Sequence, residues 1–125
     1  MKTISGFWAG VYAYPNEPFP PVKFDCELTQ SGPVLSGTLT ESHAPGQMLA
    51  AQLSGQVSGS KIQFIKSYVN AGNIWQIAYS GQINAEKNHI TGMWRVGMRT
   101  GAFEMHRDTG KLMDAETERA EEGSL

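Results

Sequence analysis

Residues 79–94, YSGQINAEKNHITGMW, hold the clearest structural signal in the chain. Segments 79–83 and 90–94 both begin and end with apolar residues that alternate with polar or small ones. Alternation with a period of two is typical of a β-strand that buries one face. Residues 85–88, AEKN, are mostly polar and predict a short connection between the segments. This stretch therefore predicts two neighbouring antiparallel strands.

The pattern apolar, Ser or Thr, Gly, any residue, apolar occurs twice more, at 35–39 and 53–57. In every copy the glycine falls on the same face as the two apolar residues, which predicts that it points inward. An inward glycine lets a strand bend and pass close to facing side chains, as a small closed barrel requires at its corners. The recurring segment therefore favours a barrel.

Strand and turn signals of this kind continue through the chain to residue 107, and helix signals are missing there. We predict an all-β domain at 1–107, a single eight-stranded antiparallel up-and-down β-barrel, because closure removes every unpaired strand edge. A Greek-key sandwich is the alternative. The predicted strands are 6–14, 22–30, 34–41, 49–58, 61–69, 74–83, 89–96 and 99–107.

Residues 108–125 differ from the rest in composition. They hold six of the twelve Asp and Glu side chains and few large apolar ones. No pattern in them could bury a face, so we predict an acidic tail that is a short helix or disordered.

The overall composition narrows the classes of partner. The chain has 125 residues, a formal net charge of −2 and only 18% charged residues, which argues against a nucleic-acid-binding surface. No apolar stretch approaches the roughly 20 residues that cross a bilayer, so we expect no membrane span and a cytoplasmic location. The single cysteine, Cys26, agrees with a reducing compartment. No sequence motif points to a cofactor.

Gly6-x-Trp8 at the start of the first predicted strand and Arg107 at the end of the last resemble the calycins, which include lipocalins, fatty-acid-binding proteins and avidins. The resemblance implies that Trp8 closes the barrel floor and that Arg107 packs over it. Stacking on the indole and donation to carbonyl groups would give Arg107 a structural role.

Segments 79–83 and 90–94 are similar to paired strands of the avidins. The polar residues that avidins place after the first tryptophan to hold the ureido group of biotin are replaced here by residues 9–12, AGVY. The resemblance therefore implies the barrel without biotin binding, since function resides in the site and not in the fold.

The long segments 15–21 and 42–48 contain prolines and are predicted to be loops at one end of the barrel, where they would form a binding rim. Inward-facing residues near that end are mostly aromatic, and those near the other end are apolar. Aromatic walls with a few polar groups suit a small hydrophobic or aromatic, anionic ligand. The predicted ligand-binding residues are Tyr12, Tyr14, Lys66, Tyr68, Trp75, Tyr79, Trp94 and Arg99.

Lys66 falls on the inward face and would be costly to bury without a partner. A ligand carboxylate or phosphate could supply that partner, with Arg99 as a second cation. Glu41 could instead form an internal ion pair with Lys66. In a further alternative, Lys66 extends to the rim, or a bulge reverses the parity and exposes it.

Two other functions compete with ligand binding. Glu41, His43 and Lys66 around the mouth would suit a small isomerase or cyclase, although they match no known catalytic motif. The outward residues of 52–56, 63–67 and 76–82 carry almost no charge, which favours packing against a second copy in a homo-oligomer.

Histidine side chains also raise the question of a metal. A surface site from His89, His106 and Glu104 would lack supporting contacts, so no metal is expected.

Overall fold

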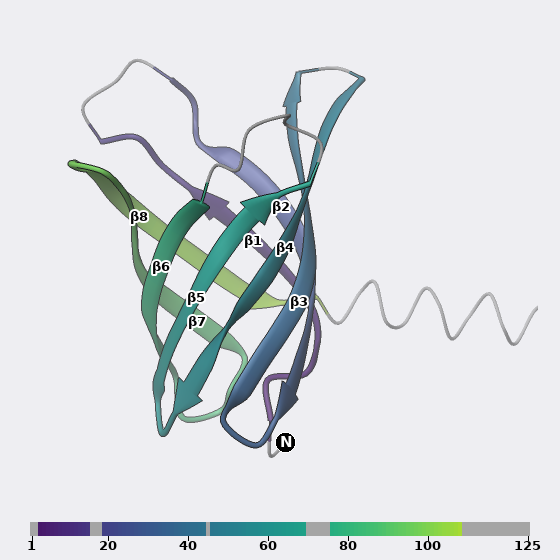
Figure 1. Ribbon diagram of the computed structural model, residues 1–125, viewed down its shortest axis with the longest axis vertical. Helices are drawn as coiled ribbons and strands as arrows, with labels where there is room; N and C mark the ends of the chain where they lie inside the picture. The colour runs from purple at the N-terminus through teal and green to yellow at the C-terminus, as the bar shows by residue number, and fades with distance from the viewer. Residues whose placement is uncertain (1–2, 16–18, 45, 70–75, 109–125) are drawn as a thin grey trace, which may run out of the picture.

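The computed structural model of the protein describes residues 3–15, 19–44, 46–69 and 76–108. Each strand pairs antiparallel with the next along the chain, and β1 pairs with β8, so that one sheet closes into a barrel (Figure 1). The predicted eight-stranded up-and-down barrel is confirmed. Its strands are β1 Gly6–Tyr12, β2 Val22–Ser31, β3 Val34–Ala44, β4 Gln47–Ser58, β5 Lys61–Tyr68, β6 Gln76–Ile83, β7 His89–Val96 and β8 Arg99–Arg107.

The prediction of a loop at 42–48 is wrong. β3 continues to Ala44 and β4 begins at Gln47, so the two strands form a hairpin that rises above the barrel at the upper end of Figure 1. Ser42 still pairs with Met48, and Gly46 has the positive φ of 80° that a tight turn requires. Hairpin arms that project into solvent bury neither face, so this part of the strands lacks the apolar alternation by which strands are recognised.

Two predicted strand ends also differ. β1 ends at Tyr12, two residues earlier than predicted, although Ala13 N still donates to the Ala102 carbonyl oxygen at 3.0 Å. The predicted start of the sixth strand at 74 lies outside the described residues, which resume at Gln76.

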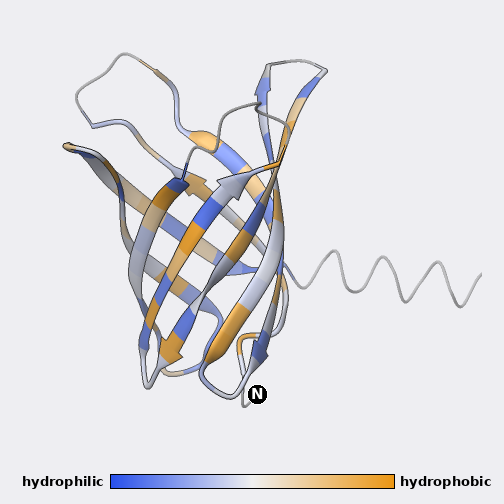
Figure 2. Cartoon of the chain, in the orientation of Figure 1, coloured by the Kyte–Doolittle hydropathy of each residue, from blue (hydrophilic) through white to orange (hydrophobic). Residues whose placement is uncertain are grey.

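The interior contains the apolar face of every strand, and polar residues alternate with apolar ones along the strands (Figure 2). The four motif glycines point inward, as predicted. A Cβ added to Gly37, Gly55, Gly81 or Gly92 would collide with a backbone carbonyl oxygen of the neighbouring strand. Adjacent strands therefore cross so closely at these positions that only glycine fits.

The lower end of the barrel is closed around Trp8, whose indole is fully buried. Trp8 Nε1 donates to the Ile4 carbonyl oxygen at 2.9 Å, which fixes the segment before β1 under the floor. The Arg107 guanidinium lies 5.0 Å from the Trp8 ring centroid and donates to the carbonyl oxygens of Ser5 and Lys87 at 2.7 and 2.8 Å. The predicted structural role of Arg107 is confirmed, and partial burial lowers its pKa.

The predicted acidic tail at 108–125 lies outside the described residues except for Asp108, whose backbone N donates to the Phe7 carbonyl oxygen at 2.9 Å. Among the residues described, there is no helix of the length and apolarity needed to span a bilayer.

Candidate functional site

A cavity of about 180 Å³ opens at the upper end of the barrel. Side chains reach it from β1, β5, β6, β7 and the first residue of β8, because inward positions of all these strands meet at this end. Seven of the eight predicted ligand-binding residues line it, and the eighth, Trp75, lies outside the described residues. The lining residues are Tyr12, Tyr14, Lys66, Tyr68, Ile77, Tyr79, Trp94, Val96 and Arg99.

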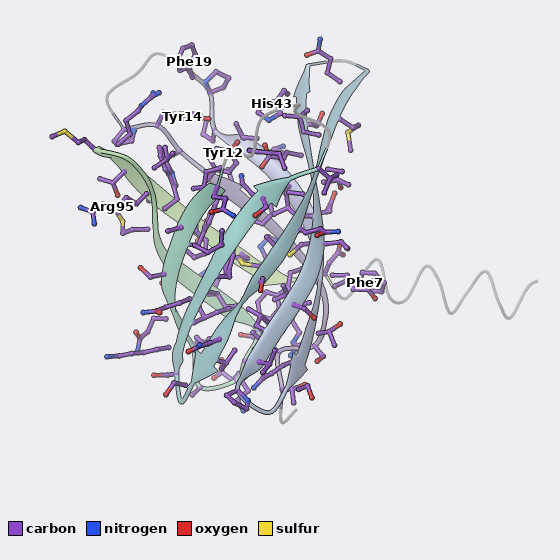
Figure 3. All side chains as sticks on the ribbon, viewed as in Figure 1. Phe7, Tyr12, Tyr14, Phe19, His43 and Arg95 are labelled. Atoms are coloured by element: carbon purple, nitrogen blue, oxygen red, sulfur yellow. The ribbon has the colours of Figure 1, made fainter. Side chains whose placement is uncertain are left out.

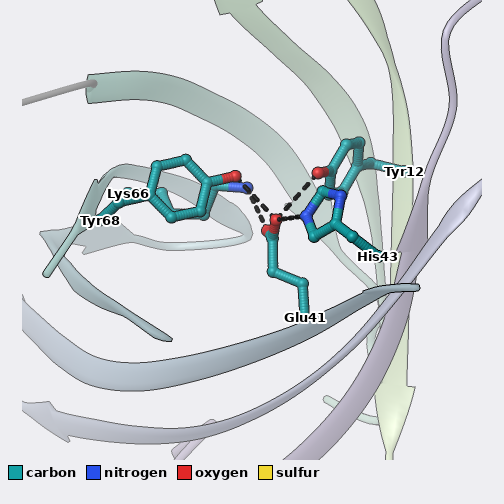
Figure 4. A network of polar contacts seen from close by, with 5 residues as sticks. All are labelled: Tyr12, Glu41, His43, Lys66 and Tyr68. Carbon is teal, nitrogen blue, oxygen red and sulfur yellow. Dashed lines mark hydrogen bonds and ion pairs between the residues drawn. The ribbon is translucent and has the colours of Figure 1, made fainter. Parts of the chain in front are cut away.

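A completely buried carboxylate, Glu41, lies beside the cavity floor and accepts hydrogen bonds from four side chains (Figure 4). Its Oε2 binds Lys66 Nζ at 2.5 Å. Its Oε1 is 2.6 Å from His43 Nε2, 2.7 Å from the Tyr68 hydroxyl and 3.0 Å from the Tyr12 hydroxyl. We call these five residues the Glu41 network.

β3 has a local irregularity at the position of His43, a member of the Glu41 network. The pairing of β3 with β4 shifts register between Ser42 and Ala44. The His43 side chain, which is 31% exposed, forms the part of the network nearest to solvent. Sequence reasoning placed Glu41 and His43 near the rim but did not link them by a hydrogen bond.

Lys66 is only 1% exposed, so the alternatives in which it extends to the rim or is turned outward are wrong. Its Nζ lies 4.4, 4.8 and 5.3 Å from the ring centroids of Tyr12, Tyr68 and Tyr79. The negative faces of aromatic rings attract a cation at such distances. Lys66 therefore has an internal partner in Glu41 and an aromatic surrounding, the second of the predicted alternatives.

The pKa values of the network follow from burial and from these contacts. Burial alone would raise the pKa of Glu41, but the charge and hydrogen bond of Lys66, with the bonds from His43 and Tyr68, hold it below its usual value. Burial lowers the pKa of Lys66 although Glu41 acts in the opposite direction. Burial and then the Glu41 carboxylate raise the pKa of Tyr12, so its hydroxyl stays protonated and donates.

The upper walls of the cavity are edge-to-face aromatic pairs. The ring centroid of Tyr14 lies 5.7 Å from that of Tyr12 and 5.5 Å from that of Trp94. On the rim, the ring centroid of Phe19 lies 5.8 Å from that of Tyr14 (Figure 3). Trp94 Nε1 donates to the Ala13 carbonyl oxygen at 3.0 Å, which ties the end of β1 to β7. The Arg99 guanidinium lies 5.9 Å from the Tyr14 ring centroid, so the rim carries a cation.

Packed aromatic rings limit the depth of the cavity. The rings of Phe64 and Tyr79 are stacked, with their centroids 4.8 Å apart. Phe103 packs edge-on against both, with centroid distances of 6.1 Å to Phe64 and 5.0 Å to Tyr79. Drug-sized ligands occupy pockets of about 300–1,000 Å³, whereas a cavity of about 150 Å³ holds a benzene molecule. A cavity of about 180 Å³ therefore suits a single ring.

Sequence reasoning missed three residues of this region. Ile77 and Val96 line the cavity, and Phe103 packs edge-on against Tyr79, which also lines it. All three share the inward parity of Tyr79, Trp94 and Met105, so the alternation along their strands could have identified them.

The surface histidines behave as predicted from the register. His89 pairs with His106 across β7 and β8, and His89 Nε2 lies 3.1 Å from Glu104 Oε2. Within the described ranges, no three His, Cys, Asp or Glu side chains gather closely enough to hold a metal ion.

Comparison with known proteins supports the fold. No protein-family model matches the chain. No curated protein matches it significantly. Among solved structures, a redesigned β-barrel superposes with a TM-score of 0.67 at 12% identity, over 84% of this chain and 91% of that one. A likeness at this level of identity shows a small barrel fold and carries no information on the ligand.

Proposed function

We propose that the protein binds a small aromatic molecule, about one ring in size, in the cavity at the upper end of the barrel. The observation that carries the proposal is a cavity of about 180 Å³ with aromatic walls and a buried ion pair at its floor. An aromatic ring would make edge and face contacts with Tyr14 and Trp94. Such contacts contribute about 0.5–1.5 kcal/mol each beyond the burial of apolar area.

The charge of the ligand is expected to lie at the rim. Lys66 is already 2.5 Å from Glu41, so an anion at the floor would meet the Glu41 carboxylate as well as the Lys66 ammonium. Arg99 lines the cavity at its entrance. An anionic ligand would therefore insert its ring and keep its carboxylate or phosphate beside Arg99.

The same proposal includes a calycin-type relationship and a cytoplasmic location. The contact of Arg107 with Trp8 at the closed floor supports the first, because the resemblance implied that arrangement. Cys26 supports the second, because it is buried and, as the single cysteine of the sequence, cannot form a disulfide within the chain. Both are expectations for the whole protein.

Tryptophan fluorescence during titration with benzoate tests the proposal, because Trp94 lines the cavity. We expect saturable binding of benzoate and no binding of a long fatty acid, which exceeds the volume. Arg99→Gln should weaken benzoate binding about two- to fivefold, the effect of an exposed charge pair. Arg95→Gln is the matched control, because Arg95 lies on β7 and points outward (Figure 3). Absence of saturation by benzoate and by neutral single-ring compounds would refute the proposal.

Self-association is the second candidate function, and a hollow on the outside of the barrel favours it. This hollow of about 560 Å³ lies over β4 to β8, where small side chains such as Ser54, Ala78 and Ser80 face outward. Ile65 and Met93 are 37% and 49% exposed there. A second copy of the chain is the proposed occupant, because the outward faces of β4 and β6 carry no charged residue and Arg95 is the one charged residue that lines the hollow.

A further inference from the structure

The interior of this barrel contains one ion pair, Glu41 with Lys66, among the residues described. Replacement of such buried pairs by apolar residues of similar volume is often neutral or stabilising. The lower interior shows that this barrel can be filled by apolar residues alone, such as Leu28, Ile62 and Met105. Stability therefore does not explain a lysine at this position. Its place beside a cavity suggests a chemical role.

Lys66 Nζ has the surroundings of a reactive amine. It is removed from solvent, lies among the rings of Tyr12, Tyr68 and Tyr79, and contributes to the cavity lining. A carboxylate oxygen 2.5 Å away can take up its proton. Buried lysines of this kind serve as nucleophiles toward carbonyl compounds.

We infer that Lys66 is a covalent attachment site for a small aromatic aldehyde, which it holds as a protonated imine with Glu41 as the counter-ion. The inference rests on the proposed function, because the aldehyde must first occupy the same cavity. The inference specifies an aldehyde as the functional group of the ligand that faces Lys66 at the cavity floor.

The reaction balances without an external reagent. The Lys66 ammonium gives one proton to Glu41, and the neutral amine forms a bond to the aldehyde carbon, whose oxygen becomes a hydroxyl with a second amine proton. That hydroxyl leaves as water with the proton held by Glu41. The nitrogen keeps one hydrogen and the positive charge, so ammonium and aldehyde give iminium and water.

The Glu41 network fits both the reactant and the product. The iminium nitrogen keeps the charge of Lys66, so the ion pair with Glu41 persists after the reaction. The hydroxyls of Tyr12 and Tyr68 and the His43 ring remain on Glu41 Oε1 and hold the carboxylate in place. The lowered pKa of Lys66 increases the neutral fraction of its amine relative to that of an exposed lysine. The size of the cavity limits the aldehyde to one ring.

Reductive trapping with 4-formylbenzoate and cyanoborohydride tests the inference, since reduction converts the imine into a stable secondary amine. Peptide mass spectrometry then compares Lys66 with Lys61, an exposed lysine on the same strand. We expect Lys66 to be labelled faster than Lys61, because the cavity holds the aldehyde beside Lys66 Nζ and the lowered pKa of Lys66 raises the neutral fraction of its amine. An excess of 4-methylbenzoate, which lacks the aldehyde, should slow labelling of Lys66 and leave Lys61 unchanged.

Two variants serve as controls. Lys66→Arg keeps the charge but cannot form the imine, so the label at this position should vanish, and Lys61→Arg should leave labelling of Lys66 intact. Equal labelling of Lys66 and Lys61 in the unmodified protein would overturn the inference, whatever the variants do. If 4-methylbenzoate then still binds by fluorescence, the proposed function stands and only the covalent step is wrong. If neither 4-methylbenzoate nor a neutral single-ring compound binds, both are wrong.

Discussion

At the scale of single residues, the Glu41 network shows what parity can and cannot predict. Alternation along β3 and β5 predicts that Glu41 and Lys66 point inward. The two residues pair with Leu49 and Leu53 on β4, so their strands are not neighbours in the sheet. Their contact joins two strands that flank β4. Whether Glu41 or a ligand is the partner of Lys66 depends on the distance between the two side chains, which the strand register does not give.

The ion pair predicts strong coupling between two substitutions. Glu41→Gln leaves Lys66 buried without a counter-ion, and Lys66→Met leaves Glu41 in the same position, so each should lower the free energy of unfolding by roughly 3–5 kcal/mol. The double variant buries no charge at this site and should recover most of the loss. Urea denaturation of the four proteins measures the coupling. Additive losses would show that the two side chains do not depend on each other.

Stability against acid follows from the pKa of Glu41. Because its folded-state pKa is lowered from the ordinary 4.5, the stabilisation from ionised Glu41 is fully present above about pH 4.5 and is lost as the pH falls through the folded value. The loss should be about 1.4 kcal/mol for each unit between the two values. When the pH is lowered from 5 through the folded pKa of Glu41, the double variant Glu41→Gln, Lys66→Met should lose less stability than the unmodified protein. Glu27→Gln on the exposed face of β2 is the control and should keep the full loss.

At the scale of the strands, the glycine motif predicted the closed barrel correctly. The upper hairpin of β3 and β4 was instead predicted as a loop. The glycines could be recognised because each lies between two buried apolar residues, for example Gly55 between Leu53 and Val57. The upper part of the hairpin projects from the barrel, so its sequence does not show the alternation of apolar and polar residues that a buried face produces. Strand prediction by periodicity therefore succeeds only where the strand packs against a core.

The close crossing of β4 and β5 makes Gly55 sensitive to a single methyl group. A Cβ at Gly55 would collide with the Gln63 carbonyl oxygen and lie 2.5 Å from Phe64 Cα, both of which are backbone atoms that cannot rotate away. Gly55→Ala should lower the free energy of unfolding by about 1–3 kcal/mol. Ser54→Ala, on the exposed face of the same strand, should change it by less than about 0.5 kcal/mol. Thermal and urea unfolding give both values. A gain in stability from Gly55→Ala would mean that the strands can separate at little cost.

At the scale of the whole molecule, closure could be predicted from the sequence, and the volume of the cavity could not. The pairing of Gly10 with Met105 completes a ring whose strand number follows from counting segments. The cavity volume depends instead on how Phe64, Tyr79 and Phe103 stack below it. That packing involves side chains from three strands, so the sequence of any one strand does not predict it.

The outer hollow predicts how the molecule associates. Gln63 and Ser80 face each other across β5 and β6 within it, so Gln63→Lys with Ser80→Lys would place two adjacent charges where a second copy must exclude water. Sedimentation velocity should show a dimer of the unmodified protein and a monomer of this variant. Thr29→Lys with Ser36→Lys is the matched control, because these two exposed residues face each other across β2 and β3, and it should remain dimeric. High salt should weaken the dimer little, since the faces of β4 and β6 carry no charges and the lining of the hollow offers no acidic partner to Arg95, its one charged residue. An unmodified protein that stays monomeric at every concentration would remove self-association from its functions, whereas a dimer that survives both pairs of substitutions would place the interface on another part of the barrel.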